Sequence, residues 1–294
     1  VSNSIRNLLG SSGGTSSVAY SPESFATGLS AGDATSSDAK ASGSGWLNIT
    51  PTRYDQRALL PGTTGLQEID GESVSLLAGL DRVLGSRFVA GAFVGYEDSE
   101  VEYRAISGLQ ENTGFSLGGY GGVAFNQWLF SSVNLSWAQL DNELEERAFN
   151  AAEAQRANYD LQRLSFGVDL TAATQRGKLS YLAKAVFNYS EESYDAYRTG
   201  RGERVQLEDL SLARLSFGGE VSYLGESWNP YLAVNYEVDT SASQTVADDN
   251  GFVVNAGIRT VHNDRLALEA YLATVTGRSN ENQELLGFYI NYAF

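Results

Sequence analysis

The sequence predicts an all-β protein, a transmembrane antiparallel up-and-down barrel of about twelve strands. Apolar and polar residues alternate with a period of two through most of the chain after Trp46. Long polar connections alternate with short turns. The segment from Gly287 to Phe294 places aromatic or apolar side chains on one strand face and small or polar ones on the other. Since no run reaches the roughly 18 to 20 apolar residues of a spanning helix, strands must make any membrane crossing.

Composition excludes several classes of site. The chain has 294 residues, with no Cys, no Met, 31 Gly, 16 Tyr, 13 Phe and 4 Trp. Without cysteine it has neither disulfides nor thiolate ligands or nucleophiles. The 20 Lys and Arg against 36 Asp and Glu leave a net charge of −16, so we expect no nucleic-acid partner. Because an initiating Met and a signal peptide are both missing, we expect a processed piece of a longer product.

Residues 1–45 are predicted to be a linker ahead of the barrel domain, residues 46–294. The linker is rich in Ser, Gly, Ala and Thr, a composition that cannot bury a core. Short helices are compatible with residues 5–9 and with residues 24–29. The second of these follows a capping pattern at Ser21-Pro22-Glu23.

About twelve alternating segments follow the linker, and each has one apolar face. In the second, Val74, Leu76 and Leu80 lie on the face predicted to meet lipid, while Ser75 and Asp81 lie on the face predicted to line the lumen. The same alternation recurs in the other segments. The predicted strands are residues 45–50, 72–83, 87–103, 114–125, 128–140, 159–174, 178–189, 211–224, 231–238, 252–261, 266–275 and 284–294.

The connections set the orientation of the predicted barrel. Outer-membrane barrels have short turns on the periplasmic side and longer loops outside. We therefore expect the first strand to start, and the last strand to end, at the periplasm. The short connections are residues 84–86, 126–127, 175–177, 225–229 and 262–264. The long polar connections are residues 51–71, 104–113, 141–158, 190–210, 239–251 and 277–283.

Charged residues of both signs fall on the predicted lumen face. They would be costly in a dry core, but around water they are tolerated and can pair across the lumen. We therefore expect a hydrated interior. The alternative is that those near strand ends are simply solvated. The predicted lumen-lining residues are Asp81, Glu97, Arg163, Asp169, Lys184, Arg214, Glu220, Glu237, Arg259 and Glu269.

Glycines recur beside aromatic residues, at Gly95-Tyr96, residues 118–122 and Phe217-Gly218-Gly219. We expect an aromatic side chain of one strand to rest on the bare glycine backbone of its neighbour, which curves and closes the sheet. Nucleotide binding would instead need a glycine-rich turn that leads from a strand into a helix. The sequence contains no such turn.

Residues 46–294 resemble the translocator barrel of autotransporters of type Va secretion. None of the matching motifs is specific alone, but their order, spacing and position are specific together. The motifs are Gly79-Leu80-Asp81 in the second predicted strand, Gly95-Tyr96 in the third, Tyr120-Gly121 in the fourth, Arg214 with Gly218 in the eighth, Pro230-Tyr231 at the start of the ninth, and the terminal Phe294.

This resemblance implies a translocator and surface anchor in the bacterial outer membrane that exports and displays its own N-terminal passenger. The other implied partners are the barrel assembly machinery, periplasmic chaperones, and outer-membrane lipids including lipopolysaccharide. The last strand resembles an assembly signal, whose apolar face consists of Phe288, Ile290, Tyr292 and Phe294. Taken alone, that segment also fits an ordinary edge strand whose apolar face packs on a core.

Two alternatives remain open at this point. Part of the linker is expected to plug the lumen, as the resemblance implies, but a disordered periplasmic tail is also consistent with its composition. The alternative function is a stand-alone outer-membrane channel or an adhesin-like barrel whose extracellular loops are functional.

We expect no enzymatic activity, no cofactor and no metal. Hydrolytic outer-membrane barrels usually place a His beside Ser or Asp near the outer rim, whereas the single histidine, His262, falls in a predicted periplasmic turn. One alternative is self-cleavage of the linker inside the lumen. It would use Asn3 or Asn7 beside Glu237 or Glu269.

Overall fold

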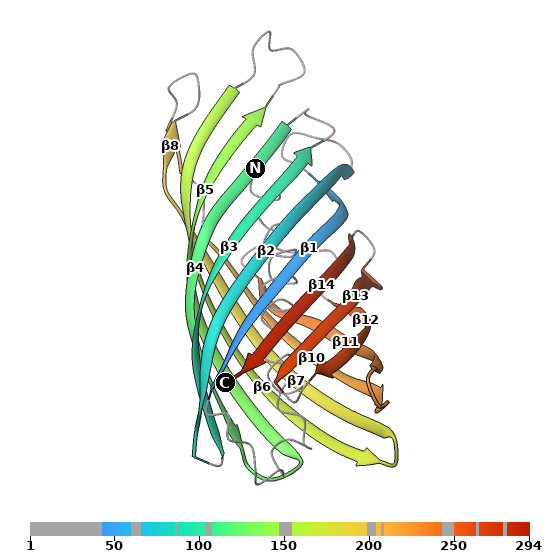
Figure 1. The fold of residues 1–294 in the computed structure, drawn as a ribbon. Helices are drawn as coiled ribbons and strands as arrows, with labels where there is room; N and C mark the ends of the chain where they lie inside the picture. Colours follow the sequence, from blue (N-terminus) through green and yellow to red (C-terminus); the bar gives the residue numbers. More distant parts are fainter. Residues whose placement is uncertain are drawn as a thin grey trace.

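The protein is a closed antiparallel barrel with a small separate hairpin (Figure 1). A computed structural model describes residues 43–59, 66–85, 87–103, 108–146, 155–198, 204–206, 209–242, 250–262, 265–278 and 281–294. Twelve strands within these ranges form the barrel, which confirms the predicted fold class and strand number. The barrel strands are β1 (Gly43–Leu59), β2 (Leu66–Leu84), β3 (Phe88–Tyr103), β4 (Gly108–Ala124), β5 (Leu129–Glu146), β6 (Gln155–Arg176), β7 (Leu179–Tyr194), β10 (Leu210–Tyr223), β11 (Asn229–Ala242), β12 (Asn250–His262), β13 (Leu266–Thr276) and β14 (Glu281–Ala293). The hairpin strands are β8 (Tyr197–Arg198) and β9 (Arg204–Val205).

The barrel closes between its first and last strands. Each barrel strand pairs with the barrel strands next to it along the chain, and β14 pairs with β1, with Trp46 opposite Asn291. The backbone N–H of Phe294 donates to the carbonyl of Gly43, with an N···O distance of 3.0 Å. Closure pairs the two edges that an open sheet would expose to lipid. The expected pairing of the terminal strand with the Trp46 strand is confirmed.

Several strands run past their predicted ends, so the predicted long loops are partly wrong. A loop is predicted over residues 51–71, but β1 continues to Leu59 and β2 begins at Leu66. Strand β6 has 22 residues, about twice the roughly 9–11 that cross a bilayer. The predicted ends lie where the apolar face stops. The apolar face stops where contact with lipid stops, but the backbone hydrogen bonds between strands continue beyond that point.

The two ends of the barrel differ. The turn end carries the start of β1, the end of β14 and the connections β2–β3, β4–β5, β6–β7, β10–β11 and β12–β13. Gly85 and Gly177 have φ values of 71° and 62° there, which favour glycine in tight turns. The loop end carries the other connections and the β8–β9 hairpin (Figure 1). The described residues include no helix that is long and apolar enough to cross a membrane.

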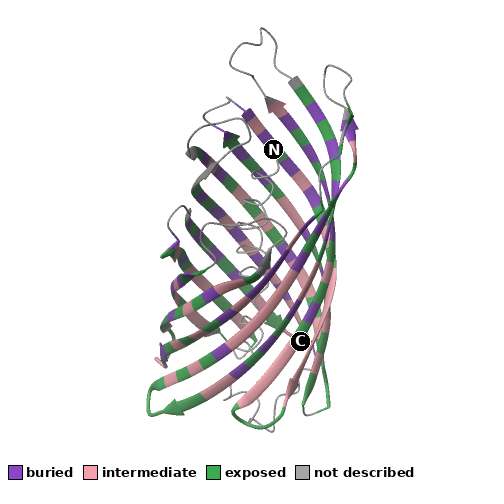
Figure 2. Ribbon diagram, turned by 180° about the vertical axis from the view of Figure 1, so that it is seen from behind, coloured by how far each residue is buried: buried purple, intermediate pink, exposed green. Residues whose placement is uncertain are grey.

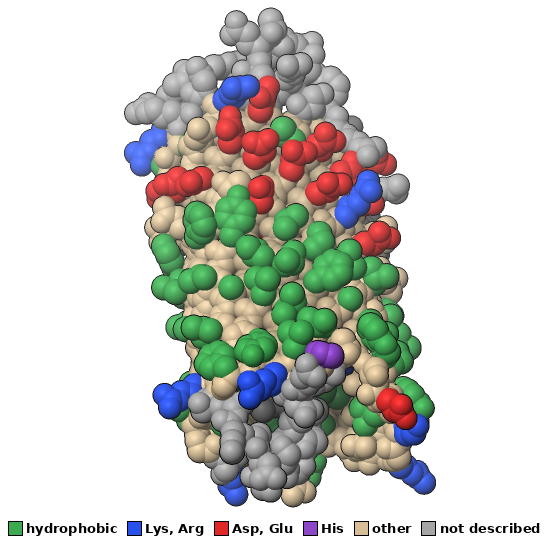
Figure 3. Space-filling model, in the orientation of Figure 1, with side chains coloured by type: hydrophobic (Ala, Val, Ile, Leu, Met, Phe, Trp, Pro, Cys, Tyr) green, Lys and Arg blue, Asp and Glu red, His purple; other side chains and the backbone are tan. Residues whose placement is uncertain are grey.

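A belt of exposed apolar side chains surrounds the middle of the barrel. Exposed and more buried residues alternate along the strands (Figure 2). Phe115 is 68% exposed, Leu272 63% and Phe294 60%, and Figure 3 shows the belt on one face. An apolar surface of this extent is suited to lipid. The predicted outward position of residues such as Val74 and Leu80 is confirmed by their exposure.

On the outer wall beyond the belt, at the loop end, the side chains are acidic. Glu72, Glu100, Glu111 and Glu143 are exposed and occupy directly opposite positions on β2, β3, β4 and β5. Figure 3 shows acidic side chains above the apolar belt. Carboxylates opposed in this way repel one another, and water screens that repulsion. This zone of the wall therefore belongs in water.

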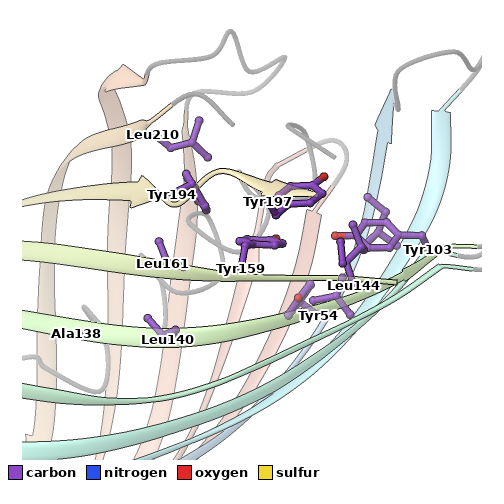
Figure 4. Close-up of a cluster of buried hydrophobic side chains, with 13 residues drawn as sticks. Tyr54, Tyr103, Ala138, Leu140, Leu144, Tyr159, Leu161, Tyr194, Tyr197 and Leu210 are labelled. Atoms are coloured by element: carbon purple, nitrogen blue, oxygen red, sulfur yellow. The ribbon is translucent and has the colours of Figure 1, made fainter. Parts of the chain in front are cut away.

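On the inner wall of the same zone, the side chains are apolar and aromatic (Figure 4). The ring of Tyr159 stacks on Tyr197 of β8, with centroids 5.1 Å apart. Burial raises the pKa of Tyr159, so its phenol stays neutral. Beyond the lipid, the wall thus resembles a β-sheet of a soluble protein, with an apolar inner face and a polar outer face. The cluster consists of Tyr54, Ile69, Val101, Tyr103, Ala138, Leu140, Leu144, Ala157, Tyr159, Leu161, Tyr194, Tyr197 and Leu210.

Aromatic side chains rest on glycines inside the barrel, as predicted for residues 118–122. A Cβ placed on Gly118 would lie 2.0 Å from Cζ of Phe93 on β3. A Cβ placed on Gly91 would lie 2.1 Å from Cζ of Tyr120 on β4. Only glycine therefore fits beneath these rings without a shift of the neighbouring strand.

The same expectation is wrong at two other glycines. A Cβ on Gly95 would meet Oγ of Ser116 at 2.3 Å, and one on Gly218 would meet Oδ1 of Asn235 at 1.8 Å. A Cβ on Gly95 would also lie 2.4 Å from Cδ2 of Leu77, so a polar and an aliphatic side chain cover Gly95, whereas the polar Asn235 covers Gly218.

Gly118→Ala should destabilise the barrel, whereas Gly119→Ala should not. The new methyl group at position 118 would overlap the Phe93 ring and lie 2.8 Å from the carbonyl oxygen of Leu135. Overpacking of this kind costs about 1–3 kcal/mol. At Gly119 the nearest atom to a Cβ is 3.5 Å away, which is ordinary contact. Urea unfolding of both purified variants measures the difference, and equal midpoints would contradict the prediction.

Candidate functional site

The barrel lumen contains the charged residues predicted from the sequence. All ten lie on the inner face of their strands, and Arg163, Asp169, Lys184, Arg214 and Glu237 among them are buried. The structure shows which of these charges pair within the described residues. Three of the pairs join residues directly opposite each other on neighbouring strands. The pair of Arg163 with Glu97 instead spans the two strands between β6 and β3.

Arg163 lies between two carboxylates. It is directly opposite Glu192 of β7, with Nε 2.7 Å from Oε1, and both side chains are almost fully buried. Its Nη1 also lies 2.9 Å from Oε2 of Glu97 on β3. On the two strands between, Gly114 is opposite Glu97 and Ala138 is opposite Arg163. These small residues leave the guanidinium a path along the wall.

A second cluster joins two arginines to two carboxylates. Nε of Arg214 lies 2.6 Å from Oδ1 of Asp239, at a register shift between β10 and β11. Nη1 of Arg214 lies 3.3 Å from Oε2 of Glu237. Arg278 follows Gly277, whose φ is 86°, and its Nη1 lies 3.2 Å from Oδ2 of Asp239. The two positive charges balance the two negative ones.

A third cluster is centred on Arg259 of β12. Its Nη1 lies 2.6 Å from Oε1 of Glu220, and its Nε lies 3.2 Å from Oε2 of Glu269. The guanidinium carbon is 3.8 Å from the centroid of the Tyr231 ring. The hydroxyl of Tyr231 donates to Oε1 of Glu269 at 2.6 Å. Hydrogen bonds and ring contact therefore hold this arginine in one orientation.

Asp81 belongs to a hydrogen-bond network near the closing seam. The Ser44 hydroxyl donates to Oδ1 of Asp81 at 2.8 Å, and the Tyr120 hydroxyl donates to Oδ2 at 3.2 Å. The indole N–H of Trp46 donates to the Tyr120 hydroxyl at 2.9 Å. The network links β1, β2 and β4 on the lumen side.

Asp169 and Lys184 complete the predicted set. Asp169 accepts hydrogen bonds from the hydroxyls of Ser132 and Thr171, the second at 3.3 Å. Lys184 lies on β7, directly opposite Gly218 of β10. Both charged side chains are buried in the wall.

Three ion-pair partners, Glu192, Asp239 and Arg278, are missing from the prediction. All three fall in segments predicted to be loops. For the two carboxylates a signal existed, because the period of two continues from Lys184 to Glu192 and from Glu237 to Asp239. For Arg278 the sequence gives no such signal, because Gly277 interrupts the alternation.

A cavity of about 80 Å³ lies in the lumen. It is lined by polar side chains such as Glu97 and Arg163 and by apolar ones such as Leu77 and Phe93. The three arginine clusters neutralise much of the wall's charge internally.

Within the described residues, the side chains that were considered for catalysis do not lie together. His262 ends β12 at the turn end, is exposed, and accepts a hydrogen bond at its carbonyl from the N–H of Arg265. Glu237 and Glu269 are held in ion pairs. Asn3 and Asn7 lie outside the described residues, as does the predicted pore segment before residue 43.

The last strand carries the predicted apolar face. Phe288, Ile290, Tyr292 and Phe294 are all exposed on the outer surface. Phe294 lies at the turn end beside Gly43, where the barrel closes. The residues of the predicted assembly signal are therefore accessible from outside the barrel.

The chain is similar to known translocator barrels. An autotransporter β-domain family model matches residues 45–292. The structure is similar to the translocator domain of the autotransporter NalP from Neisseria meningitidis, with a TM-score of 0.73 and 12% identity, over 95% of this chain and 98% of that one. For the β-domain of the Bordetella autotransporter BrkA the TM-score is 0.73 and the identity 16%, over 86% and 100% of the two chains. For the transport unit of AIDA-I from Escherichia coli they are 0.63 and 17%, over 94% and 100%. These structural similarities show a shared fold, and no curated protein matches in sequence.

Proposed function

This chain belongs to the autotransporter β-domain family, and we propose that its lumen is the path along which an N-terminal passenger crosses the outer membrane. The domain is an outer-membrane translocator barrel that serves such a passenger. In our proposal the turn end faces the periplasm and the loop end faces the exterior. The passenger passes from the first end to the second.

One observation carries the proposal: the barrel is closed, and behind its apolar outer belt the inner face carries charged and polar side chains. The chain enters β1 at Gly43, beside Phe294 at the turn end. Segments before residue 43 therefore join the barrel on the periplasmic side. From there the route passes the paired charges of the lumen and then the apolar cluster on the inner wall at the loop end.

A reporter fused ahead of Val1 and directed to the periplasm by a signal peptide should become exposed on intact cells. Protease added outside should then remove the reporter and leave the barrel in the membrane. The control is the same digestion after the outer membrane has been permeabilised. A reporter that is cleaved only after permeabilisation, while the barrel itself is folded in the outer membrane, would falsify the proposal.

We propose two further groups of partners. Periplasmic chaperones keep the unfolded chain soluble, because half of each spanning strand is apolar and would otherwise aggregate. The barrel assembly machinery then reads the exposed face of β14, which includes Phe288 and Phe294. Phospholipids and lipopolysaccharide cover the apolar belt after insertion.

We also propose that the barrel is not an enzyme. His262, the single histidine of the chain, is exposed at the end that faces the periplasm in our proposal. Glu237 and Glu269, the carboxylates considered for self-cleavage, are engaged by arginines and are poorly placed to activate a nucleophile. Mass spectrometry of the chain after export would reveal a cut within the linker.

A further inference from the structure

Five basic side chains lie around the turn end of the barrel. They are exposed, and they lie at or next to the β2–β3, β6–β7 and β12–β13 connections. Glu226 is the one exposed side-chain carboxylate at the turns of this end that the structure describes. Figure 3 shows basic side chains below the apolar belt and mainly acidic ones above it. We call the five residues the basic rim: Arg82, Arg87, Arg176, Lys178 and Arg265.

The basic rim has no carboxylate partner among the residues that the structure describes. None of the five forms an ion pair with a carboxylate of the described residues, whereas Arg163, Arg214 and Arg259 in the lumen each contact two. Lys178 has one neighbour of note, the Tyr223 ring, whose centroid is 5.8 Å from Nζ. Unpaired guanidinium and ammonium groups at a surface are available to an external anion.

Exposed aromatic side chains mark the depth of the rim in the membrane. Phe88, Phe125, Trp128, Trp228 and Phe294 are all exposed at the turn end. Aromatic girdles of barrels lie at the boundary between hydrocarbon and headgroups. Basic residues at or just beyond such a girdle are at the level of the lipid phosphates.

We propose that the basic rim binds the headgroups of anionic glycerophospholipids in the periplasmic leaflet. This inference rests on the proposed function for the orientation of the barrel. The chemistry is complementary, because a guanidinium donates paired hydrogen bonds to a phosphodiester and an ammonium adds a point charge. The acidic outer wall at the other end disfavours contact with the same anionic lipid.

Quenching of tryptophan fluorescence by brominated lipids tests the proposal. Trp128 and Trp228 are exposed near the rim, while Trp46 is buried in the lumen. Trp137 lies in the apolar belt and would also be quenched. With Trp137→Phe, the quenching reports mainly on Trp128 and Trp228 near the rim. The purified barrel is reconstituted with brominated phosphatidylglycerol or brominated phosphatidylcholine at equal mole fraction. A cation near an anionic surface enriches the anionic lipid by about fivefold, so phosphatidylglycerol should quench more strongly.

Two triple variants in the same background assign the effect to the rim. Each replaces three exposed arginines and changes the net charge from −16 to −19. The first, which keeps only Arg87 and Lys178 of the rim, should strongly reduce the preference for phosphatidylglycerol, and the second, at the loop end, should retain it in full. The rim variant is Arg82→Gln, Arg176→Gln and Arg265→Gln, and the control variant is Arg53→Gln, Arg156→Gln and Arg204→Gln.

Equal quenching by the two lipids in the unsubstituted rim would overturn the proposal, and so would a preference that is undiminished in the rim variant. If the rim variant does not fold, salt provides a second measurement, because screening should remove the preference at high ionic strength. A preference that is independent of salt would also overturn the proposal. The surface reporter separates this failure from failure of the proposed function, since passenger export does not depend on lipid preference in the vesicle assay.

Discussion

Arg163→Ala should lower the free energy of unfolding of the barrel by about 3–5 kcal/mol. The substitution leaves Glu97 and Glu192 close together without the arginine that now lies 2.9 and 2.7 Å from their oxygens. Glu192 has no exposed side-chain area, so the substitution leaves a buried carboxylate without its cation. Urea unfolding in detergent or lipid vesicles, followed by tryptophan fluorescence, measures the change.

Arg156→Ala is the matched control, because it removes the same side chain from the same strand. Arg156 contacts Glu145 at 3.0 Å, but its side chain is 68% exposed. Pairs of this kind contribute about 0–1 kcal/mol, so little change is expected. In a barrel that carries Arg163→Met, the two carboxylates are again without their arginine. Adding Glu97→Gln and Glu192→Gln to that variant should recover part of the lost stability. Equal effects at positions 156 and 163 would show that the buried cluster has no special role.

Phe294→Asp, or deletion of Phe294, should reduce the amount of barrel in the outer membrane to a small fraction of the normal level. The effect on the folded barrel should be much smaller. Phe294 is 60% exposed, and a charged side chain on the lipid face near the interface costs only about 0–1 kcal/mol. The contact between its backbone N–H and Gly43 does not require the ring. Membrane fractionation measures assembly, and refolding of the purified variant in detergent measures stability.

Phe125→Asp is the control that separates recognition of the last residue from the general loss of an exposed aromatic side chain at the turn end. Phe125 is also exposed at the turn end, at 51%, but it follows β4. We expect it to assemble at nearly the normal level. A normal outer-membrane level of Phe294→Asp, or an equal loss with Phe125→Asp, would count against an assembly signal in the last strand.

The lumen residues show how far a period of two can predict a site. The pattern identified the inward-facing charges correctly, because alternation around Val74 or Leu215 assigns each neighbour to a face. It did not identify their partners. Glu97 and Arg163 belong to β3 and β6, and their contact depends on the stagger of the strands between them. That stagger is a property of the closed barrel.

The sequence by itself determined the barrel class, the strand number, the pairing of the first and last strands, and the lipid and lumen faces. It could do so because lipid contact requires apolar residues at alternate positions of every spanning strand. Only the tertiary structure decided how far β1 and β6 extend beyond the lipid, and that the wall then turns apolar inside and acidic outside. Where lipid no longer constrains the outer face, backbone pairing with neighbouring strands determines the length of each strand, and the sequence pattern loses its meaning there.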